Sequence, residues 1–166
     1  MKKFELTSEF ITNIFGTKLF RIKALIEFGN VKAGELGGFV EKEENLNHEG
    51  NAWVYGNAEV YGNARVYGNA SVYGNASVYG NASVYGNARV CGDARVCGDA
   101  RVYGNAWVYG NARVCDDARV YGNADYATVH GFGSEYRTTT FFKTKAGEIG
   151  VRCGCFYGNL SEFRKK

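Results

Sequence analysis

The sequence contains no proline, one methionine, two histidines and two tryptophans among its 166 residues. Its histidines, His48 and His130, cannot supply the three histidine ligands of a catalytic zinc ion from one chain. No segment approaches the roughly 18 consecutive apolar residues that a membrane-spanning helix needs. After Lys2 and Lys3 the chain lacks the apolar region of a secretory signal. We therefore expect no membrane span, no metal centre and no cofactor.

Charge and composition further limit the classes of partner and fold. Twenty basic residues stand against 17 acidic ones, and a net charge of +3 is too balanced to indicate a polyanionic partner. Twenty-three glycines without any proline are typical of regularly spaced turns rather than of a flexible linker. The length is that of one domain that can bury its own apolar core.

An uninterrupted repeat occupies residues 50–121. These 72 residues are twelve units of Gly-Asn-Ala-x-Val-Tyr without an insertion. Valine fills its slot in every unit, and alanine fills its slot in every unit as well. Aspartate replaces the repeat asparagine at three positions, and Asp116 replaces one repeat glycine.

The chemistry of each slot predicts its place in the structure. A β-branched valine between larger residues suits a short strand in which valine points inward while x and tyrosine point outward. Gly-Asn supplies a turn, because both residues tolerate positive φ, and alanine is small enough to point inward at a tight corner. Three such units close a triangular coil of 18 residues, and successive coils stack as parallel strands about 4.8 Å apart.

The repeats resemble the hexapeptide-repeat family of left-handed β-helices, which includes many acyltransferases and γ-class carbonic anhydrases. The likeness covers residues 50–121. It implies an all-β fold, a left-handed parallel β-helix shaped as a triangular prism. With the flanking segments we expect an N-terminal cap and a C-terminal cap made of a β-hairpin and a short helix.

Three regions follow from the extent of the repeat. Residues 1–49 are predicted to form an N-terminal cap with a degenerate first coil, and residues 50–127 the β-helix. Residues 128–166 are predicted to form the C-terminal cap, because stacked parallel strands expose unpaired backbone at both ends. An alternating apolar pattern in the first region predicts a strand at Phe20, Ile22, Ala24, Ile26 and Phe28.

The repeat frame extends beyond the array. Counting back one coil from the first unit places Leu36 in a valine slot, and the same register places Val40 and Leu46 in alanine slots. After the array, Ala124 and Tyr126 hold the alanine and valine slots.

The C-terminal region has its own pattern. Residues 138–143 and 149–156 predict a hairpin with a turn between them. A short terminal helix is expected to follow, with Asn159 or Ser161 as its N-cap residue.

Both ends carry a second resemblance, to hexapeptide proteins of bacterial phages and mobile elements. It lies in residues 31–40, residues 132–142 and the motif Cys153-Gly154-Cys155-Phe156. The resemblance implies an accessory role in a bacterial host cell. An inhibitor of a host defence protein, such as an anti-CRISPR, is one hypothesis of this kind.

Every third unit shares one side of the prism, so outward side chains form columns. The first face has Trp53, Ser71, Arg89 and Trp107 in its x slots, beside Tyr55, Tyr73, Cys91 and Tyr109. The second face has Glu59, Ser77, Arg95 and Arg113, beside Tyr61, Tyr79, Cys97 and Cys115. The third face has Arg65, Ser83, Arg101 and Arg119, beside Tyr67, Tyr85, Tyr103 and Tyr121.

The third face is the candidate binding surface. Its four stacked tyrosines beside Arg65, Arg101 and Arg119 offer apolar area, hydrogen bonds and cation–π contacts, as residues at the centre of protein interfaces do. Trp53 and Trp107 on the first face are further candidates. Stacked tyrosines are also favourable sheet pairs in their own right. A continuous exposed aromatic strip nevertheless favours a cover, either a homo-oligomer (a dimer or trimer) or a foreign protein.

The five cysteines are an odd number, and three of them occupy the tyrosine slot. We interpret these three as tolerated substitutions in a reducing, cytoplasmic compartment rather than as a disulfide framework. Cys97 and Cys115 stack on adjacent coils, close enough for a disulfide or a metal, but no further ligands are evident. Cys153 and Cys155 are expected to pack as small apolar residues on a strand.

Two other functions remain as alternatives. A hexapeptide-repeat acyltransferase would need a histidine as general base, for which His130 is the candidate. Both His130 and His48 fall in repeat slots outside the array and are interpreted as capping residues. A nucleic-acid or nucleotide-binding module is disfavoured, because residues 50–121 hold six arginines against five acids.

Overall fold

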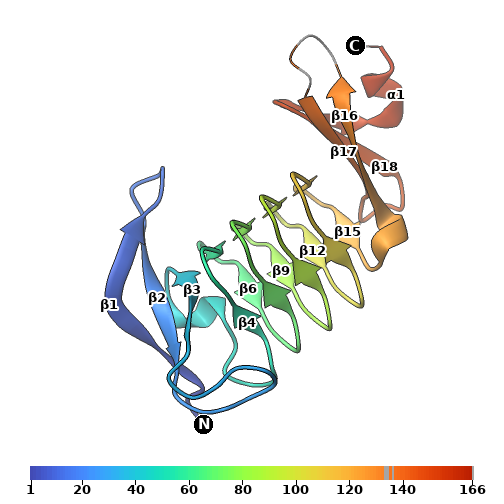
Figure 1. Ribbon diagram of the computed structural model, residues 1–166. Helices are drawn as coiled ribbons and strands as arrows, with labels where there is room; N and C mark the ends of the chain where they lie inside the picture. The colour runs from blue at the N-terminus through green and yellow to red at the C-terminus, as the bar shows by residue number, and fades with distance from the viewer. Residues whose placement is uncertain (133–134, 136, 166) are drawn as a thin grey trace.

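The computed structural model describes residues 1–132, 135 and 137–165 and shows a parallel β-solenoid with a cap at each end (Figure 1). Each repeat unit contributes a two-residue strand made of x and valine. The strands are β4 (Trp53–Val54), β5 (Glu59–Val60), β6 (Arg65–Val66), β7 (Ser71–Val72), β8 (Ser77–Val78), β9 (Ser83–Val84), β10 (Arg89–Val90), β11 (Arg95–Val96), β12 (Arg101–Val102), β13 (Trp107–Val108), β14 (Arg113–Val114) and β15 (Arg119–Val120). The predicted all-β fold with parallel coils is confirmed, whereas the left hand of the winding stays a prediction.

Strands one coil apart pair in parallel and in register, so three sheets form the sides of the solenoid. The first face is β4, β7, β10 and β13, the second contains β5, β8, β11 and β14, and the third is β6, β9, β12 and β15. Valine pairs with valine at each step, as Val72 does with Val90. Side chains 18 residues apart therefore lie in columns, as predicted.

The core consists of the two small apolar slots of the repeat. Every repeat valine and alanine has at most 1% of its surface exposed. The repeat glycines take positive φ at the corners, where coils approach closely: Gly86 has a φ of 70°, and a Cβ there would lie 3.0 Å from Gly104 N. Asp116, which replaces a repeat glycine, keeps the same conformation with a φ of 61°.

Outside the strand ladders, the backbone hydrogen bonds between coils run in one direction. Ser83 N donates to Ala100 O at 2.9 Å, and Tyr85 N donates to Val102 O at 3.0 Å, so at the strand ends and corners each coil donates N–H groups to carbonyls of the next. At the corners, the first coil of the array is left with carbonyl groups that the incomplete coil before it does not reach, and the last coil with N–H groups that no following coil can satisfy. Buried polar groups of this kind need other partners.

Two buried side chains satisfy the carbonyls at the N-terminal end. Lys3 Nζ donates to Gly50 O at 3.3 Å and to Ala52 O at 2.9 Å. Burial lowers the pKa of the Lys3 ammonium group to about 8, which still leaves it protonated at neutral pH. At another corner, Asn45 Nδ2 donates to Gly62 O at 3.1 Å and to Ala64 O at 2.9 Å. Both side chains thus act as donors at corners where the incomplete preceding coil supplies no backbone N–H group.

The N-terminal cap is a hairpin that continues into the second face (Figure 1). Its elements are β1 (Phe4–Thr12), β2 (Lys18–Ala24), β3 (Leu36–Val40) and the 3-10 helix η1 (Glu43–Asn45). Strand β3 pairs antiparallel with β2 and parallel with β5, so it joins the hairpin to the solenoid. The predicted strand is confirmed as β2, but it ends before Ile26 and Phe28, and β1 was not predicted.

The predicted frame of the first coil is wrong. Val40 pairs with Val60 and Leu46 with Val66, so both occupy valine slots at an offset of 20 residues rather than 18. Leu46 is six residues after Val40 but eight before Val54, which places two additional residues at the corner that contains His48. Leu36 consequently falls outside the core and is 53% exposed.

The C-terminal cap is an antiparallel sheet followed by a short helix. Its elements are η2 (Asn123–Asp125), β16 (Tyr126–Phe132), β17 (Arg137–Lys143), β18 (Ile149–Cys153), β19 (Phe156–Asn159) and α1 (Leu160–Phe163). The hairpin and the helix are confirmed, and Asn159 is the N-cap, accepting a hydrogen bond from Glu162 N at 2.9 Å. Strands β16 and β19 were not predicted. Ala124 is exposed rather than inward, because the chain leaves the coil at η2.

Side-chain oxygens of this cap accept the N–H groups of the last coil. Asn123 Oδ1 accepts from Trp107 N at 2.8 Å, and Thr140 Oγ1 accepts from Arg113 N at 2.9 Å. Three residues of the second resemblance, Gly133, Ser134 and Tyr136, lie outside the described residues. Within the part of the chain that is described, no helix is long and apolar enough to cross a membrane.

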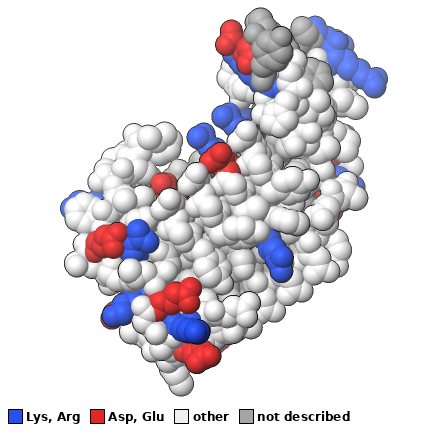
Figure 2. Space-filling model, viewed as in Figure 1, with Lys and Arg blue, Asp and Glu red and all other residues white. Residues whose placement is uncertain are grey.

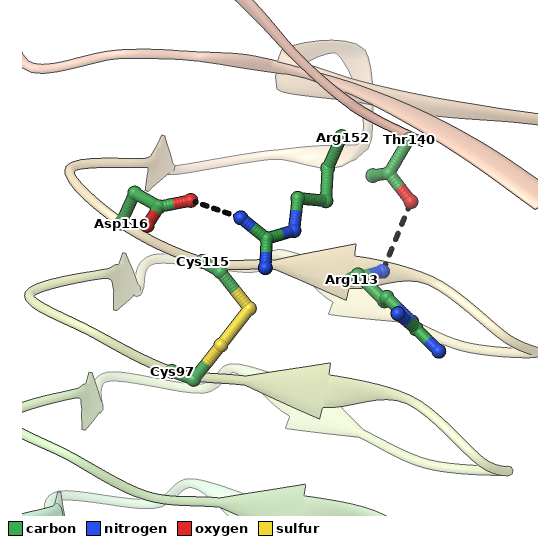
Figure 3. Close-up of a disulfide and its surroundings, with 6 residues drawn as sticks. All are labelled: Cys97, Arg113, Cys115, Asp116, Thr140 and Arg152. Atoms are coloured by element: carbon green, nitrogen blue, oxygen red, sulfur yellow. Dashed lines mark hydrogen bonds and ion pairs between the residues drawn. A yellow bond between two sulfur atoms is a disulfide. The ribbon is translucent and has the colours of Figure 1, made fainter. Parts of the chain in front are cut away.

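A disulfide joins Cys97 and Cys115 on the second face (Figure 3). Their Cα atoms are 4.4 Å apart, because the coil pitch stacks the two slots directly. The interpretation as tolerated substitutions is therefore wrong for these two cysteines. Next to the bridge, Arg152 Nη1 lies 3.3 Å from Asp116 Oδ2, an ion pair that ties the C-terminal sheet to the last coil.

The other three cysteines are free thiols. Cys91 is buried on the first face, Cys153 is half-buried at the end of β18, and Cys155 is exposed. The expected packing of Cys155 is wrong, because β18 ends at Cys153 and Gly154, with a φ of 59°, turns the chain before Cys155.

Asn45→Ala should lower the free energy of unfolding by about 3 kcal/mol, because two buried carbonyls lose their donor. The matched control is Asn63→Ala, which removes an exposed amide-to-amide bond to Asn81 and should cost less than about 1 kcal/mol. Urea unfolding of the two variants measures the difference. Equal losses would contradict the capping role of Asn45.

Cys97→Ser should lower the free energy of unfolding by about 3 kcal/mol, because it removes a crosslink between residues 18 apart in sequence. Cys155→Ser, at an exposed free thiol, should have no effect. Thermal unfolding with and without dithiothreitol tests this, and the reduced wild type should match Cys97→Ser. If oxidised wild type and Cys97→Ser unfold at one temperature, the bridge does not stabilise the fold.

Candidate interaction surface

The predicted tyrosine column is present on the third face. The rings of Tyr67 and Tyr85 are stacked with centroids 4.8 Å apart, and those of Tyr85 and Tyr103 are stacked at 5.1 Å. Tyr121 meets Tyr103 edge-on at 5.2 Å and is 62% exposed. The three stacked rings are half-buried. The coil pitch therefore sets a nearly regular strip of aromatic rings with one tilted member at its C-terminal end.

The arginines beside the column are not equivalent. Arg65 and Arg101 are exposed, and their side chains make no hydrogen bond or salt bridge with the described residues. Arg119 is half-buried, and its Nη1 donates to Asp99 O and Ala118 O, both at 2.9 Å. Its guanidinium group thus closes a corner of the solenoid, and the free charge on the third face comes from Arg65 and Arg101.

Trp53 is not part of any exposed surface, which corrects the prediction that it faces a partner. It is fully buried, with its ring 5.3 Å from Phe28 and 6.2 Å from Phe4. The N-terminal cap covers the first coil of the first face and encloses the indole. Repeat periodicity could not reveal this, because the covering residues lie outside the repeat.

Trp107 is 43% exposed, but it lies on the first face, on a different sheet from the tyrosine column. Its Nε1 donates to Cys91 Sγ at 3.1 Å, and its ring lies 5.5 Å from that of Tyr109. A cavity of about 640 Å³ is lined by Trp107, Tyr109 and Tyr126, where the first face meets the C-terminal sheet. The structure therefore separates this aromatic site from the third face.

The N-terminal end of the third face is hollowed. A cavity of about 630 Å³ is lined by Tyr67 and Arg65 on one side and by Glu43, Glu44 and His48 of the cap on the other. This feature was not predicted, because it depends on the longer corner after Leu46. Charges of both signs thus border the end of the aromatic strip.

The surface of the solenoid carries few charged side chains in the space-filling view (Figure 2). On the side shown in Figure 2, charged side chains are few over the solenoid, and both signs mix toward the N-terminal end. That side carries no continuous basic track of the kind that a nucleic-acid backbone would follow.

Tyr67, at the N-terminal end of the third face, has a perturbed hydroxyl. Burial raises the pKa of the Tyr67 hydroxyl above its ordinary value, the adjacent Tyr85 adds to the effect, and Arg101 and Arg65 oppose it. A phenol with a raised pKa stays protonated far above pH 7. The strip therefore offers hydroxyl donors and acceptors beside two cations.

Both histidines make contacts within the caps. His48 Nδ1 accepts a hydrogen bond from Lys3 N at 3.1 Å, and the imidazole stacks on Phe4 at 4.4 Å. His130 Nδ1 lies 2.9 Å from Thr138 Oγ1. The additional corner residues remove His48 from the valine slot that the frame predicted. Among the described residues, no cluster of three or more His, Cys, Asp or Glu side chains could hold a metal ion.

The second face carries a shorter column with the same geometry. Tyr61 and Tyr79 are stacked with ring centroids 5.0 Å apart. Both line a cavity of about 290 Å³ with Ile14 and Phe15 at the tip of the β1–β2 hairpin. This column therefore has the same ring stacking as the tyrosine column of the third face, but it lies beside the hairpin tip of the N-terminal cap.

Comparison with known proteins bears on the array alone. A family model described as YdcK Beta solenoid repeat matches residues 58–74, 94–110 and 112–124. These segments are similar to a β-solenoid repeat. They cover less than half of the chain and, except for residues 122–124, lie within the coils, so they support the repeat fold without indicating an activity. No curated protein matches the chain.

Alkaline pH should destabilise the fold between pH 10 and 12. Burial, and then the adjacent Tyr79 and Glu59, raise the pKa of Tyr61 to about 12 from an ordinary value of 10.0. Burial also raises the pKa of Tyr126 to about 12. The unfolded chain loses these protons near pH 10 while the folded chain keeps them, so stability falls as pH rises through this window.

Urea unfolding at pH 9, 10 and 11 measures this decline. Tyr61→Phe has no ionisable hydroxyl at this position and should show a shallower decline than the wild type. An identical pH dependence in the two proteins would show that Tyr61 has an ordinary pKa.

Proposed function

We propose that this chain is a non-catalytic scaffold that binds a protein partner through the third face. The observation that carries the proposal is the in-register column from Tyr67 to Tyr121, flanked by the guanidinium groups of Arg65 and Arg101, which have no partner among the described residues. Tyrosine and arginine are the residue types that contribute most binding free energy at protein interfaces.

The rigidity of the solenoid favours binding of this kind. Strands on both sides of each ring are fixed by inter-coil hydrogen bonds, as at Tyr85 N to Val102 O. The tyrosine side chains are already ordered by their stacking neighbours, so little conformational entropy is lost when a partner covers them. The adjacent cavity with Glu43 and Glu44 would let a partner add charged contacts beyond the aromatic strip.

The partner is either a second copy of the chain, which gives a dimer or trimer, or another protein. If the partner is another protein, the chain would act as a phage-encoded inhibitor of a host defence protein, such as an anti-CRISPR. That role rests on the resemblance of both ends to phage and mobile-element proteins, and it places the chain in the cytoplasm of a bacterial host.

The double variant Tyr85→Ala/Tyr103→Ala should lose partner binding or self-association while it remains folded. Removing two central aromatic contacts should weaken association by at least about tenfold. Light scattering gives the mass of the wild type and the variant. Capture from bacterial lysate on wild-type and variant protein, followed by affinity measurement with the purified partner, tests the foreign-partner option.

The double variant Tyr61→Ala/Tyr79→Ala is the matched control, because it removes a stacked pair of the same geometry from the second face. It should keep the association that the third-face variant loses. Equal loss in both variants would point to a general loss of stability, and unchanged association in both would exclude the third face as the interface.

A further inference from the structure

Three arginines converge on a cavity where the second face meets the C-terminal sheet. The cavity has a volume of about 360 Å³, and its lining includes Arg95, Arg113, Arg137, Asn111 and Thr138. None of these residues belongs to the third face, so the cavity is distinct from the surface discussed above.

The fold brings these side chains together from two regions. Arg95 on β11 and Arg113 on β14 are parallel partners on adjacent coils. Arg137 is the first residue of β17, which is held against β14 by the hydrogen bond from Arg113 N to Thr140 Oγ1 at 2.9 Å. A Cβ at Gly154 would lie 2.7 Å from Arg137 Nη1, so glycine there leaves room for the guanidinium group.

Among the described residues, no carboxylate lies within salt-bridge distance of the three guanidinium groups, although Glu59, two coils from Arg95, acts on Arg95 at longer range. None of them forms a salt bridge or a side-chain hydrogen bond with the described residues. Asp93 is the one carboxylate among the described lining residues, and it accepts a hydrogen bond from Asn75 Nδ2 at 3.1 Å. Figure 3 shows the guanidinium group of Arg113 turned away from Asp116, whose carboxylate pairs with Arg152.

This arrangement is unfavourable without a ligand. Like charges directly opposite each other on paired strands repel, and here Arg95 and Arg113 are one coil apart. Three positive groups against Asp93 leave a local charge of +2 in the cavity. A dianion would neutralise that charge and relieve the repulsion.

We propose that this cavity binds a phosphoryl dianion, either free phosphate or a small phosphate monoester. Guanidinium groups present paired N–H donors that match the oxygens of a phosphoryl group. The Thr138 hydroxyl and the Asn111 amide add uncharged donors at the same cavity. A volume of about 360 Å³ is within the range of small-molecule sites and exceeds what the phosphoryl group alone would fill.

The distribution of charge along the second face favours a small ligand over a nucleic-acid strand. In the x column the arginines give way to Ser77 and then to Glu59 toward the N-terminal end. Strand-binding proteins instead carry a positive groove along several nucleotides. The positive charge here converges on one cavity and ends within two coils.

Calorimetric titration and thermal unfolding of the full chain in low-salt buffer test the proposal. The probes are inorganic phosphate, O-phosphoserine and, at matched ionic strength, chloride. Both phosphoryl probes should bind and raise the unfolding temperature, because a ligand that binds only the folded state stabilises it. Tighter binding of O-phosphoserine assigns the site to monoesters, and equal binding assigns it to free phosphate.

Arg113→Gln and Arg95→Gln should each weaken phosphoryl binding by at least about tenfold, because each removes a charge-assisted hydrogen bond. Arg101→Gln, in the same slot on the third face, is the matched control and should bind as the wild type does. Should Arg113→Gln fail to fold, Arg95→Gln at an exposed position carries the test.

Three results would overturn the proposal. The first is equal phosphoryl affinity in the wild type, Arg95→Gln and Arg113→Gln. The second is a rise in unfolding temperature that chloride reproduces at the same ionic strength. The third is tight binding of a single-stranded oligonucleotide without measurable binding of either small probe. Because Arg101→Gln and the third-face tyrosine variants leave this cavity intact, its failure and that of the third-face proposal are distinguishable.

Discussion

The hydrogen bond from each coil to the next is the interaction on which the rest of the structure depends. Outside the strand ladders it runs from an N–H group of one coil to a carbonyl of the next, as from Ser83 to Ala100. One end of the solenoid therefore needs donors and the other needs acceptors. Lys3 and Asn45 supply donors at the N-terminal end, whereas Thr140 supplies a hydroxyl oxygen at the C-terminal end. The two caps therefore differ in chemistry at these positions, with side-chain donors at one end and a side-chain acceptor at the other.

The same hydrogen bonds fix the pitch, and the pitch decides what each column of side chains does. Tyrosines one coil apart stack, as Tyr67 and Tyr85 do at 4.8 Å, and their contact is favourable. Cysteines in that slot come close enough to form the Cys97–Cys115 bridge. Arginines at the same spacing repel unless an anion lies between them. The same spacing between coils thus produces stacked tyrosines, a disulfide and a pair of repelling arginines at different positions of the solenoid.

Sequence periodicity predicted what depends on local repetition: the strands, the buried valines and alanines, and the columns. It could not predict how residues outside the array cover or displace residues within it. Trp53 follows the repeat pattern of an outward residue, yet Phe4 and Phe28 from the cap enclose it. Two additional residues after Leu46 shift the first coil, and no periodic signal marks an insertion of that size. The odd number of cysteines favoured a reducing compartment without disulfides, and that interpretation was wrong for Cys97 and Cys115. Whether two cysteines can form a bridge depends on the distance between them, which the stacking of coils sets.

The two candidate sites also differ in whether the repeat alone predicts them. The third face follows from the repeat alone, and all four of its tyrosines were predicted as one column. The arginine cavity does not, because Arg137 and Thr138 reach it only through the packing of β17 on β14. The third face and the cavity lie on different sheets of the solenoid. A ligand held between β11, β14 and β17 would tie the C-terminal sheet more firmly to the coils, and it would do so without altering the tyrosine strip.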